Sequence, residues 1–176
     1  NGLKGVGALI KRKTAKLSPY IHGGGQENGL RSGTENVFGI KVFDIVSKEH
    51  FTSLKSNFEY VKQLNDTVRN GLNGDIFKII SSKNASPYVL SVSAVGLRGE
   101  VVMHSLEEKG ILVGNGSACS SKNPFSRVIQ ACGYDNKVLD GVIRISFSPE
   151  NTKEDVDCLI QNLNEIALKL KGIMKI

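Results

Sequence analysis

The sequence predicts an α/β domain from about residue 75 to the C-terminus. Segments with the residue alternation or the short apolar runs of strands are separated there by segments with the periodicity of amphipathic helices. The strand candidates are 76–81, 88–95, 111–113 and 142–147, and the helix candidates are 98–109, 124–132 and a last helix starting near Thr152. We therefore expect a short sheet covered by helices.

Local signals place the ends of these helices. Gly110 follows helix 98–109 and is expected to stop it. Pro124 suits a first helical position. Thr152 and Asp155 have the spacing of an approximate capping box, which predicts the start of the last helix.

Residues 37 to 74 have helical periodicity throughout. The pattern predicts one helix from Val37 to about Ser47 and a second one from Phe51 that ends near residues 71–74, where two glycines lie. Asn65 falls within the apolar stripe of the second helix, so its amide must find a polar partner there.

The first residues predict a turn that leads into a short buried strand over Gly5–Ile10. The chain opens on Asn1, apparently in the middle of a motif, so we expect it to be the C-terminal part of a longer protein.

Composition excludes several classes of protein. The net charge of +6 is moderate, and its densest basic run, at residues 11–16, carries no interleaved aromatic residues, so we expect no nucleic-acid binding. No apolar run is long enough to cross a bilayer. Three cysteines without a close pair form neither a disulfide framework nor a zinc pattern, and they fit a cytoplasmic location without a bound metal. Cys132 and Cys158 are interpreted as structural.

Cys119 lies in the most informative stretch of the chain, Gly114–Ser121 (Gly-Asn-Gly-Ser-Ala-Cys-Ser-Ser). Small neighbours let a bulky partner approach, and exposed loops often carry reactive groups. These features favour a nucleophilic thiol on a loop. A buried cysteine that acts as a small apolar residue is the alternative, because neither pKa nor exposure is visible in the sequence.

A second loop, His22–Asn36, contains five glycines within twelve residues, which rules out a regular element. Thr34 or a neighbour is expected to cap the following helix, whose N-terminus would favour an anion. A long ordered surface connection is the alternative.

These two loops together with Arg144–Ser146 (Arg-Ile-Ser) resemble the cysteine desulfurases, NifS-like fold-type-I pyridoxal-phosphate enzymes related to the class V aminotransferases. The order and spacing of the motifs agree along essentially the whole chain. The resemblance implies the end of the large domain at residues 1–48, a connecting helix at 49–74 and the small C-terminal domain at 75–176.

The resemblance also implies roles for three residues. Cys119 would take the sulfur of L-cysteine as a persulfide while L-alanine is released, and Arg144 would hold the substrate carboxylate. Thr34 would reach the cofactor phosphate of the other subunit, which implies a homodimer. A sulfur-acceptor or scaffold protein, for example in iron–sulfur cluster assembly, is the implied partner.

By the same resemblance, Asn1–Gly7 matches the tail of the motif that follows the cofactor-binding lysine, so that lysine would lie two residues upstream of Asn1. The chain alone is therefore expected to be inactive and not to bind the cofactor. A selenocysteine lyase or related lyase, and a non-catalytic sulfur-carrier or dimerisation module, are the alternatives. A nucleotide-binding domain is disfavoured, because the glycine loop lacks the usual strand and helix context.

Overall fold

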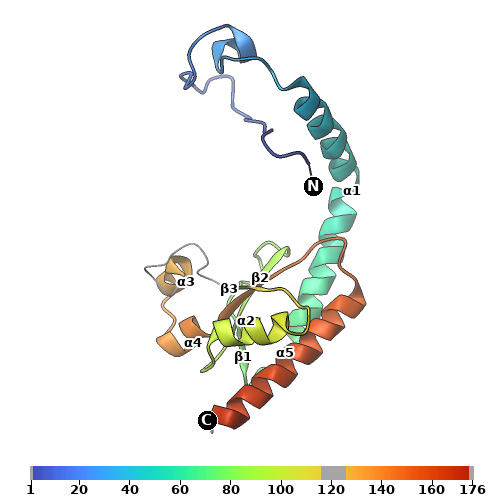
Figure 1. The fold of residues 1–176 in the computed structure, drawn as a ribbon, viewed down its shortest axis with the longest axis vertical. Coiled ribbons are helices and arrows are strands. Elements are labelled where there is room, and N and C mark those ends of the chain that lie inside the picture. Colours follow the sequence, from blue (N-terminus) through green and yellow to red (C-terminus); the bar gives the residue numbers. More distant parts are fainter. Residues whose placement is uncertain (1, 116–125, 175–176) are drawn as a thin grey trace. The chain divides into compact units, whose positions relative to one another are not determined.

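The computed structural model describes residues 2–115 and 126–174 and divides into two compact units, Asn1–Lys55 and Ser56–Ile176 (Figure 1). The helix α1, Val37–Gly71, contributes residues to both units. Each unit is described by itself. No helix of the described part of the chain combines the length and the apolar character that a membrane crossing requires.

The second unit contains an antiparallel sheet whose strands lie in the order β1-β2-β4-β3. The strands are β1 (Phe77–Ile79), β2 (Val89–Ala94), β3 (Gly114–Asn115) and β4 (Val142–Ser146). β2 and β4 form the long central pair, in which Leu90 lies opposite Ile145. This arrangement confirms the predicted short sheet covered by helices.

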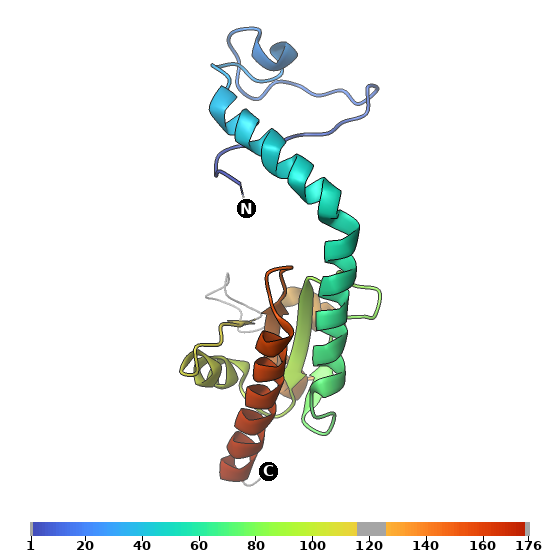
Figure 2. The same ribbon diagram turned by 90° about the vertical axis from the view of Figure 1, so that its right-hand side faces the viewer.

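One face of the sheet carries the main core. Figure 2 shows α5 (Lys153–Met174) and the C-terminal part of α1 beside the strands. These two helices and α2 (Gly99–Glu107) supply apolar side chains to the core. Fully buried members include Leu64, Val102 and Leu163. Since each side chain at the centre of such a core contributes about 1.5–3 kcal/mol through burial, this layer dominates the stability of the unit.

The opposite face is covered only in part. The helices α3 (Arg127–Ala131) and α4 (Asn136–Asp140) contribute Ile129 and Leu139 to a small second cluster with Val142. The pleat of β4 alternates accordingly, since Ile143 and Ile145 enter the main core whereas Arg144 is exposed.

The predicted helix signals at Thr152 and Gly110 are confirmed. Thr152 N–H donates to Asp155 Oδ2 (2.9 Å) and Asp155 N–H donates to Thr152 Oγ1 (3.1 Å), a reciprocal capping box at the start of α5. Gly110 adopts φ +76° in the turn that follows the last residue of α2, Glu107, and there Ile111 N–H donates back to the carbonyl of Leu106.

The prediction of two helices between residues 37 and 74 is wrong, because α1 is continuous. The segment around Ser47 interrupts the apolar pattern but contains neither glycine nor proline, so nothing breaks the backbone. Side chains one turn apart also join the two halves: Lys48 pairs with Asp44, and Thr52 donates to the carbonyl of Lys48.

The predicted buried strand at Gly5–Ile10 is also wrong. This segment is irregular, and the side chains of Leu9 and Ile10 are 75% and 95% exposed. A strand needs a neighbour to pair its backbone groups, and no described strand lies beside this one.

Two further boundaries differ from the expectation. Sheet pairing begins at Gly114 rather than within 111–113, because Gly114 and Asn115 are the described residues of this segment that pair with β4. The helix expected over 124–132 is described from Arg127, since Ser126 is extended (ψ 121°) and serves as its N-cap, while Pro124 lies outside the described residues. The short helix α4 was not predicted, although Asp135 caps it by accepting from Val138 N–H.

Candidate active site

Arg144 lies on the sheet face opposite the main core, and among the described residues its side chain is exposed. It is the third residue of β4, with Ser91 of β2 as its partner on one side and Gly114 of β3 on the other. Both neighbours are small, so the long side chain of Arg144 meets no bulky neighbour from either partner strand. None of the described residues forms a hydrogen bond or ion pair with its guanidinium. Arg144 is thus a charged, bidentate donor that is available to an anion.

The strand β3 connects this position to the segment that contains Cys119. Asn115 is the last described residue before the segment that contains Cys119, and it pairs with Ile143, the residue that precedes Arg144. Cys119 itself lies outside the described residues. The pairing of β3 with β4 therefore holds Asn115, the residue that leads into the cysteine-containing segment, next to the Gly114–Arg144 pair.

The glycine-rich loop of the first unit is ordered by its own polar groups. Ser32 Oγ donates to the carbonyl of Gly24 (2.8 Å), and Gly33 N–H donates to Gln26 Oε1 (3.3 Å). A short 3-10 turn, η1 (Gln26–Gly29), lies within the loop. These hydrogen bonds hold the two ends of the loop together, as in an ordered loop and unlike in an unstructured linker.

Thr34 follows this loop directly and is exposed. The cap of α1 is its neighbour Asn36, whose Oδ1 accepts from Gly39 N–H (3.0 Å). The prediction that Thr34 or a neighbour caps the helix is confirmed for the neighbour. The Thr34 hydroxyl makes no hydrogen bond to any described residue and is available to a ligand.

The other two cysteines are exposed. Cys132 Sγ lies 3.4 Å from the carbonyl of Val128, and Cys158 Sγ lies 3.4 Å from Asn162 Nδ2, both within one helical turn. Their interpretation as structural residues stays a prediction. Among the described residues, no three histidine, cysteine or acidic side chains are grouped so that they could hold a metal ion.

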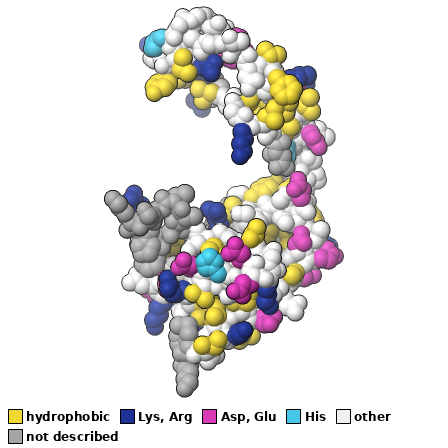
Figure 3. Space-filling view, in the orientation of Figure 1, with side chains coloured by type: hydrophobic (Ala, Val, Ile, Leu, Met, Phe, Trp, Pro, Cys, Tyr) yellow, Lys and Arg dark blue, Asp and Glu magenta, His cyan; other side chains and the backbone are white. Residues whose placement is uncertain are grey.

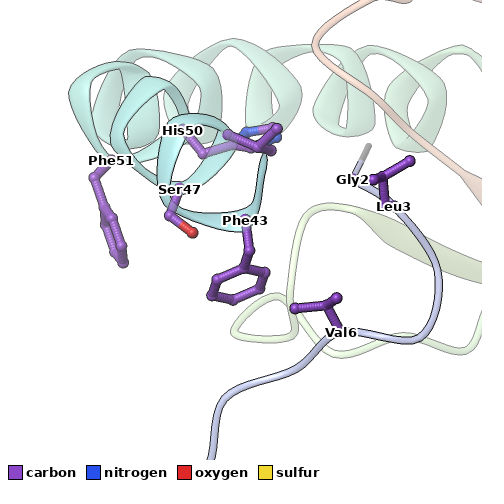
Figure 4. A pocket seen from close by; sticks show the side chains of 8 residues that line it. Gly2, Leu3, Val6, Phe43, Ser47, His50 and Phe51 are labelled. Carbon is purple, nitrogen blue, oxygen red and sulfur yellow. The ribbon is translucent and has the colours of Figure 1, made fainter. Parts of the chain in front are cut away.

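The first unit also contains a hollow of about 340 Å³ (Figure 4). Its lining comes from the N-terminal segment and from α1: Gly2, Leu3, Val6, Phe43, Val46, Ser47, His50 and Phe51. Apolar side chains dominate it, and neither Arg144 nor Thr34 belongs to it. Figure 3 shows hydrophobic side chains at the surface of the first unit. Those of the first half of α1 include Phe38, which is 73% exposed.

Comparison with known proteins agrees with the motifs and the fold. The family model "Aminotransferase class-V" matches residues 1–159 of this chain. The chain therefore belongs to the class V aminotransferase family. Several of its relatives within the family are named cysteine desulfurases. "Cysteine desulfurase IscS" of Methanosarcina thermophila is 34% identical over 98% of this chain, and the protein of the same name from Dictyoglomus turgidum is 35% identical over 98%.

Solved structures give the same result. A "NIFS-LIKE PROTEIN" superimposes with a TM-score of 0.75 at 35% identity and covers 88% of this chain. A NifS-like protein from Rickettsia africae superimposes with a TM-score of 0.72 at 27% identity. The fold is thus the α/β fold of part of a NifS-like transferase. The chain spans 43% of the length of the Methanosarcina relative and 40% of each of these two structures.

The sequence motifs point to Arg144 and Thr34 as candidate site residues but not to the residues that lie beside them. Asn36 was not singled out as the cap, although an asparagine three residues before Gly39 at the start of a helical pattern is a typical signal. The pairing of Gly114 with Arg144 had no sequence signal, because the two residues are thirty positions apart and only strand pairing brings them together.

Proposed function

We propose that this chain is the C-terminal part of a cysteine desulfurase, which removes the sulfur of L-cysteine and releases L-alanine. The observation that carries the proposal is the position of Arg144, whose exposed guanidinium has no partner among the described residues, beside the strand that leads into the segment of Cys119. Relatives named cysteine desulfurase align with nearly the whole chain, which supports the same activity.

Arg144 binds the carboxylate of the substrate in this proposal. Its planar head group offers two parallel N–H donors to the two carboxylate oxygens, which fixes the orientation of the amino acid as well as its position. The exposed location on β4 allows a small molecule to reach it, and the buried neighbours Ile143 and Ile145 anchor the strand that carries it.

Cys119 receives the sulfur. Its thiolate attacks the sulfur of the bound cysteine, so that a sulfur–sulfur bond forms and the carbon–sulfur bond of the substrate breaks. The electron pair of the broken bond stays with the substrate carbon, which takes up a proton and leaves as L-alanine. Cys119 then holds the sulfur as a persulfide until an acceptor thiol on a partner protein removes it.

Cysteine desulfurases use pyridoxal phosphate, and Thr34 fits its phosphate group. The Thr34 hydroxyl is exposed and has no described partner, and the guanidinium of Arg31 lies within the same ordered loop. A hydroxyl and a guanidinium are donors that suit a phosphate. When bound, the cofactor supplies the electron sink for the substrate. We place the lysine that binds it upstream of Asn1, and Thr34 contacts the cofactor of the second subunit of a homodimer.

The test uses the chain extended upstream through that lysine. With pyridoxal phosphate and L-cysteine, we expect L-alanine in solution and a persulfide on Cys119, measured by amino-acid analysis and mass spectrometry. Cys119→Ala removes both products, whereas Cys158→Ala, a matched change at an exposed cysteine, leaves both. The chain without the extension yields no alanine.

Three other outcomes contradict the proposal in distinct ways. Alanine formation that persists in Cys119→Ala removes the role of this thiol. Activity on selenocysteine with none on cysteine indicates a selenocysteine lyase. Absence of cofactor binding by the extended chain leaves a sulfur-carrier or dimerisation module.

A further inference from the structure

Gly114 lies where a side chain would collide with Arg144. A Cβ atom built on Gly114 would come within 3.1 Å of Arg144 Nη2, 3.2 Å of Nε and 3.4 Å of Cζ. All three nearest atoms belong to the guanidinium. The head group of Arg144 thus lies directly over the backbone of its cross-strand partner.

The backbone of Gly114 does not itself require glycine. Seven glycines of the described chain adopt a positive φ, for example Gly96 and Gly133, and Gly114 is not among them. Residues with side chains adopt its extended conformation freely. Glycine at position 114 therefore matters for the room it leaves and not for its backbone freedom. The guanidinium of Arg144 lies where a side chain of residue 114 would be.

We propose that Gly114 is a positioning residue for substrate binding, because it lets the guanidinium of Arg144 lie flat against β3 at the entrance to the cysteine-containing segment. The proposal rests on the carboxylate-binding role proposed for Arg144. A methyl group at residue 114 forces the guanidinium away by a few tenths of an ångström or more. The far end of a flexible side chain yields at little cost, so the change moves the binding group without unfolding the sheet.

The strand pairing gives this displacement a direction. Gly114 borders Arg144 on the β3 side, and Ser91 borders it on the β2 side. A side chain on Gly114 therefore pushes the guanidinium away from the strand that leads to Cys119. A substrate carboxylate that is bound by the guanidinium moves with it. Any L-amino acid whose carboxylate is bound by Arg144 is therefore expected to bind more weakly.

A double-mutant cycle on the extended, cofactor-loaded enzyme tests the proposal. The variants are Gly114→Ala, Arg144→Ala and the two combined, with Gly74→Ala as the matched control, because Gly74 also lacks a positive φ and a Cβ there meets nothing within 4 Å. The readouts are kcat and KM for L-cysteine and the Kd of L-alanine, which carries the carboxylate without the sulfur. L-alanine binding, read from the cofactor absorbance, does not depend on turnover.

We expect Gly114→Ala to raise both KM and the Kd of L-alanine about tenfold, the loss of roughly one charge-assisted hydrogen bond. In the Arg144→Ala background the same change has no further effect, and Gly74→Ala changes neither constant. Thermal unfolding of Gly114→Ala stays at the wild-type temperature.

Three results overturn the proposal and are distinguishable. If Arg144→Ala raises KM but Gly114→Ala does not, Arg144 keeps its role and Gly114 has none. If Gly114→Ala weakens binding equally in both backgrounds, it acts through the fold and not through Arg144. If Arg144→Ala itself leaves both constants unchanged, the proposed carboxylate clamp fails together with its positioning residue.

Discussion

Arg69 donates from Nε to Asn65 Oδ1 over 2.7 Å, one turn earlier on α1, while Asn65 Nδ2 donates to the carbonyl of Pro87 (2.8 Å). Arg69 also donates to the carbonyls of Ser81 and Ser82. Asn65 is 3% exposed. Asn65 and Arg69 thus join α1 to both ends of the connection between β1 and β2. The contacts to Arg69 and Pro87 supply the polar partners that the sequence predicted for the buried Asn65.

Replacement of Asn65 by alanine is expected to destabilise the chain by about 2–4 kcal/mol, because it leaves the buried carbonyl of Pro87 and the Nε donor of Arg69 without partners. Chemical denaturation followed by circular dichroism measures this difference. Asn70→Ala, the same change at an exposed position of α1, is the control and is expected to be nearly neutral. Equal stability of the two variants contradicts the role of the pair.

The capping box of α5 gives a second prediction. Thr152→Ala removes the acceptor of Asp155 N–H and is expected to cost about 1 kcal/mol, whereas Thr152→Ser keeps the hydroxyl and most of the stability. The matched control is Thr67→Ala, since Thr67 donates only to the carbonyl of Gln63 within α1. A loss at Thr67 as large as at Thr152 argues against the cap.

Acid pH is expected to weaken the first half of α1. Hydrogen bonds from Lys48 and Lys41 lower the pKa of Asp44 below its ordinary value of 3.8. Because the folded pKa is the lower one, the stabilisation is fully present above pH 3.8 and is lost as the pH falls through the folded value. An NMR titration of the Asp44 carboxyl measures the pKa directly.

High salt supplies the control for this titration. Both lysines are exposed, so 1 M salt screens the pairs and is expected to return the pKa of Asp44 toward 3.8. A pKa that is already at 3.8 in low salt shows that these ion pairs do not persist in solution.

Arginine at position 144 is expected to be needed for its shape as well as its charge. Arg144→Lys in the extended enzyme replaces a planar fork by a point charge and raises KM for L-cysteine about tenfold. Its free energy of unfolding changes by less than about 0.5 kcal/mol, since Arg144 is exposed and has no described partner. Arg98→Lys, at another exposed arginine, leaves KM unchanged. An unchanged KM in Arg144→Lys means that charge alone suffices.

Elements whose signals are local can be predicted from the amino-acid sequence. The periodicity of α2 and α5, the stop at Gly110 and the capping box at Thr152 depend on residues within a few positions of one another, and each is confirmed. The alternation in β2 and β4 predicted both central strands, because the pleat places every second side chain in the core. The motifs likewise sufficed for the family, which the comparisons confirm.

The tertiary structure decided what depends on partners distant in the sequence. The apolar segment Gly5–Ile10 is no strand, because a strand exists only where another strand pairs with it. β3 begins at Gly114, the first described residue of this segment that pairs with β4, and the same register places Gly114 beside Arg144. Pairing of distant strands lowers the entropy of the chain, and only contacts between residues distant in the sequence offset this cost. A local sequence pattern therefore does not predict which strands pair.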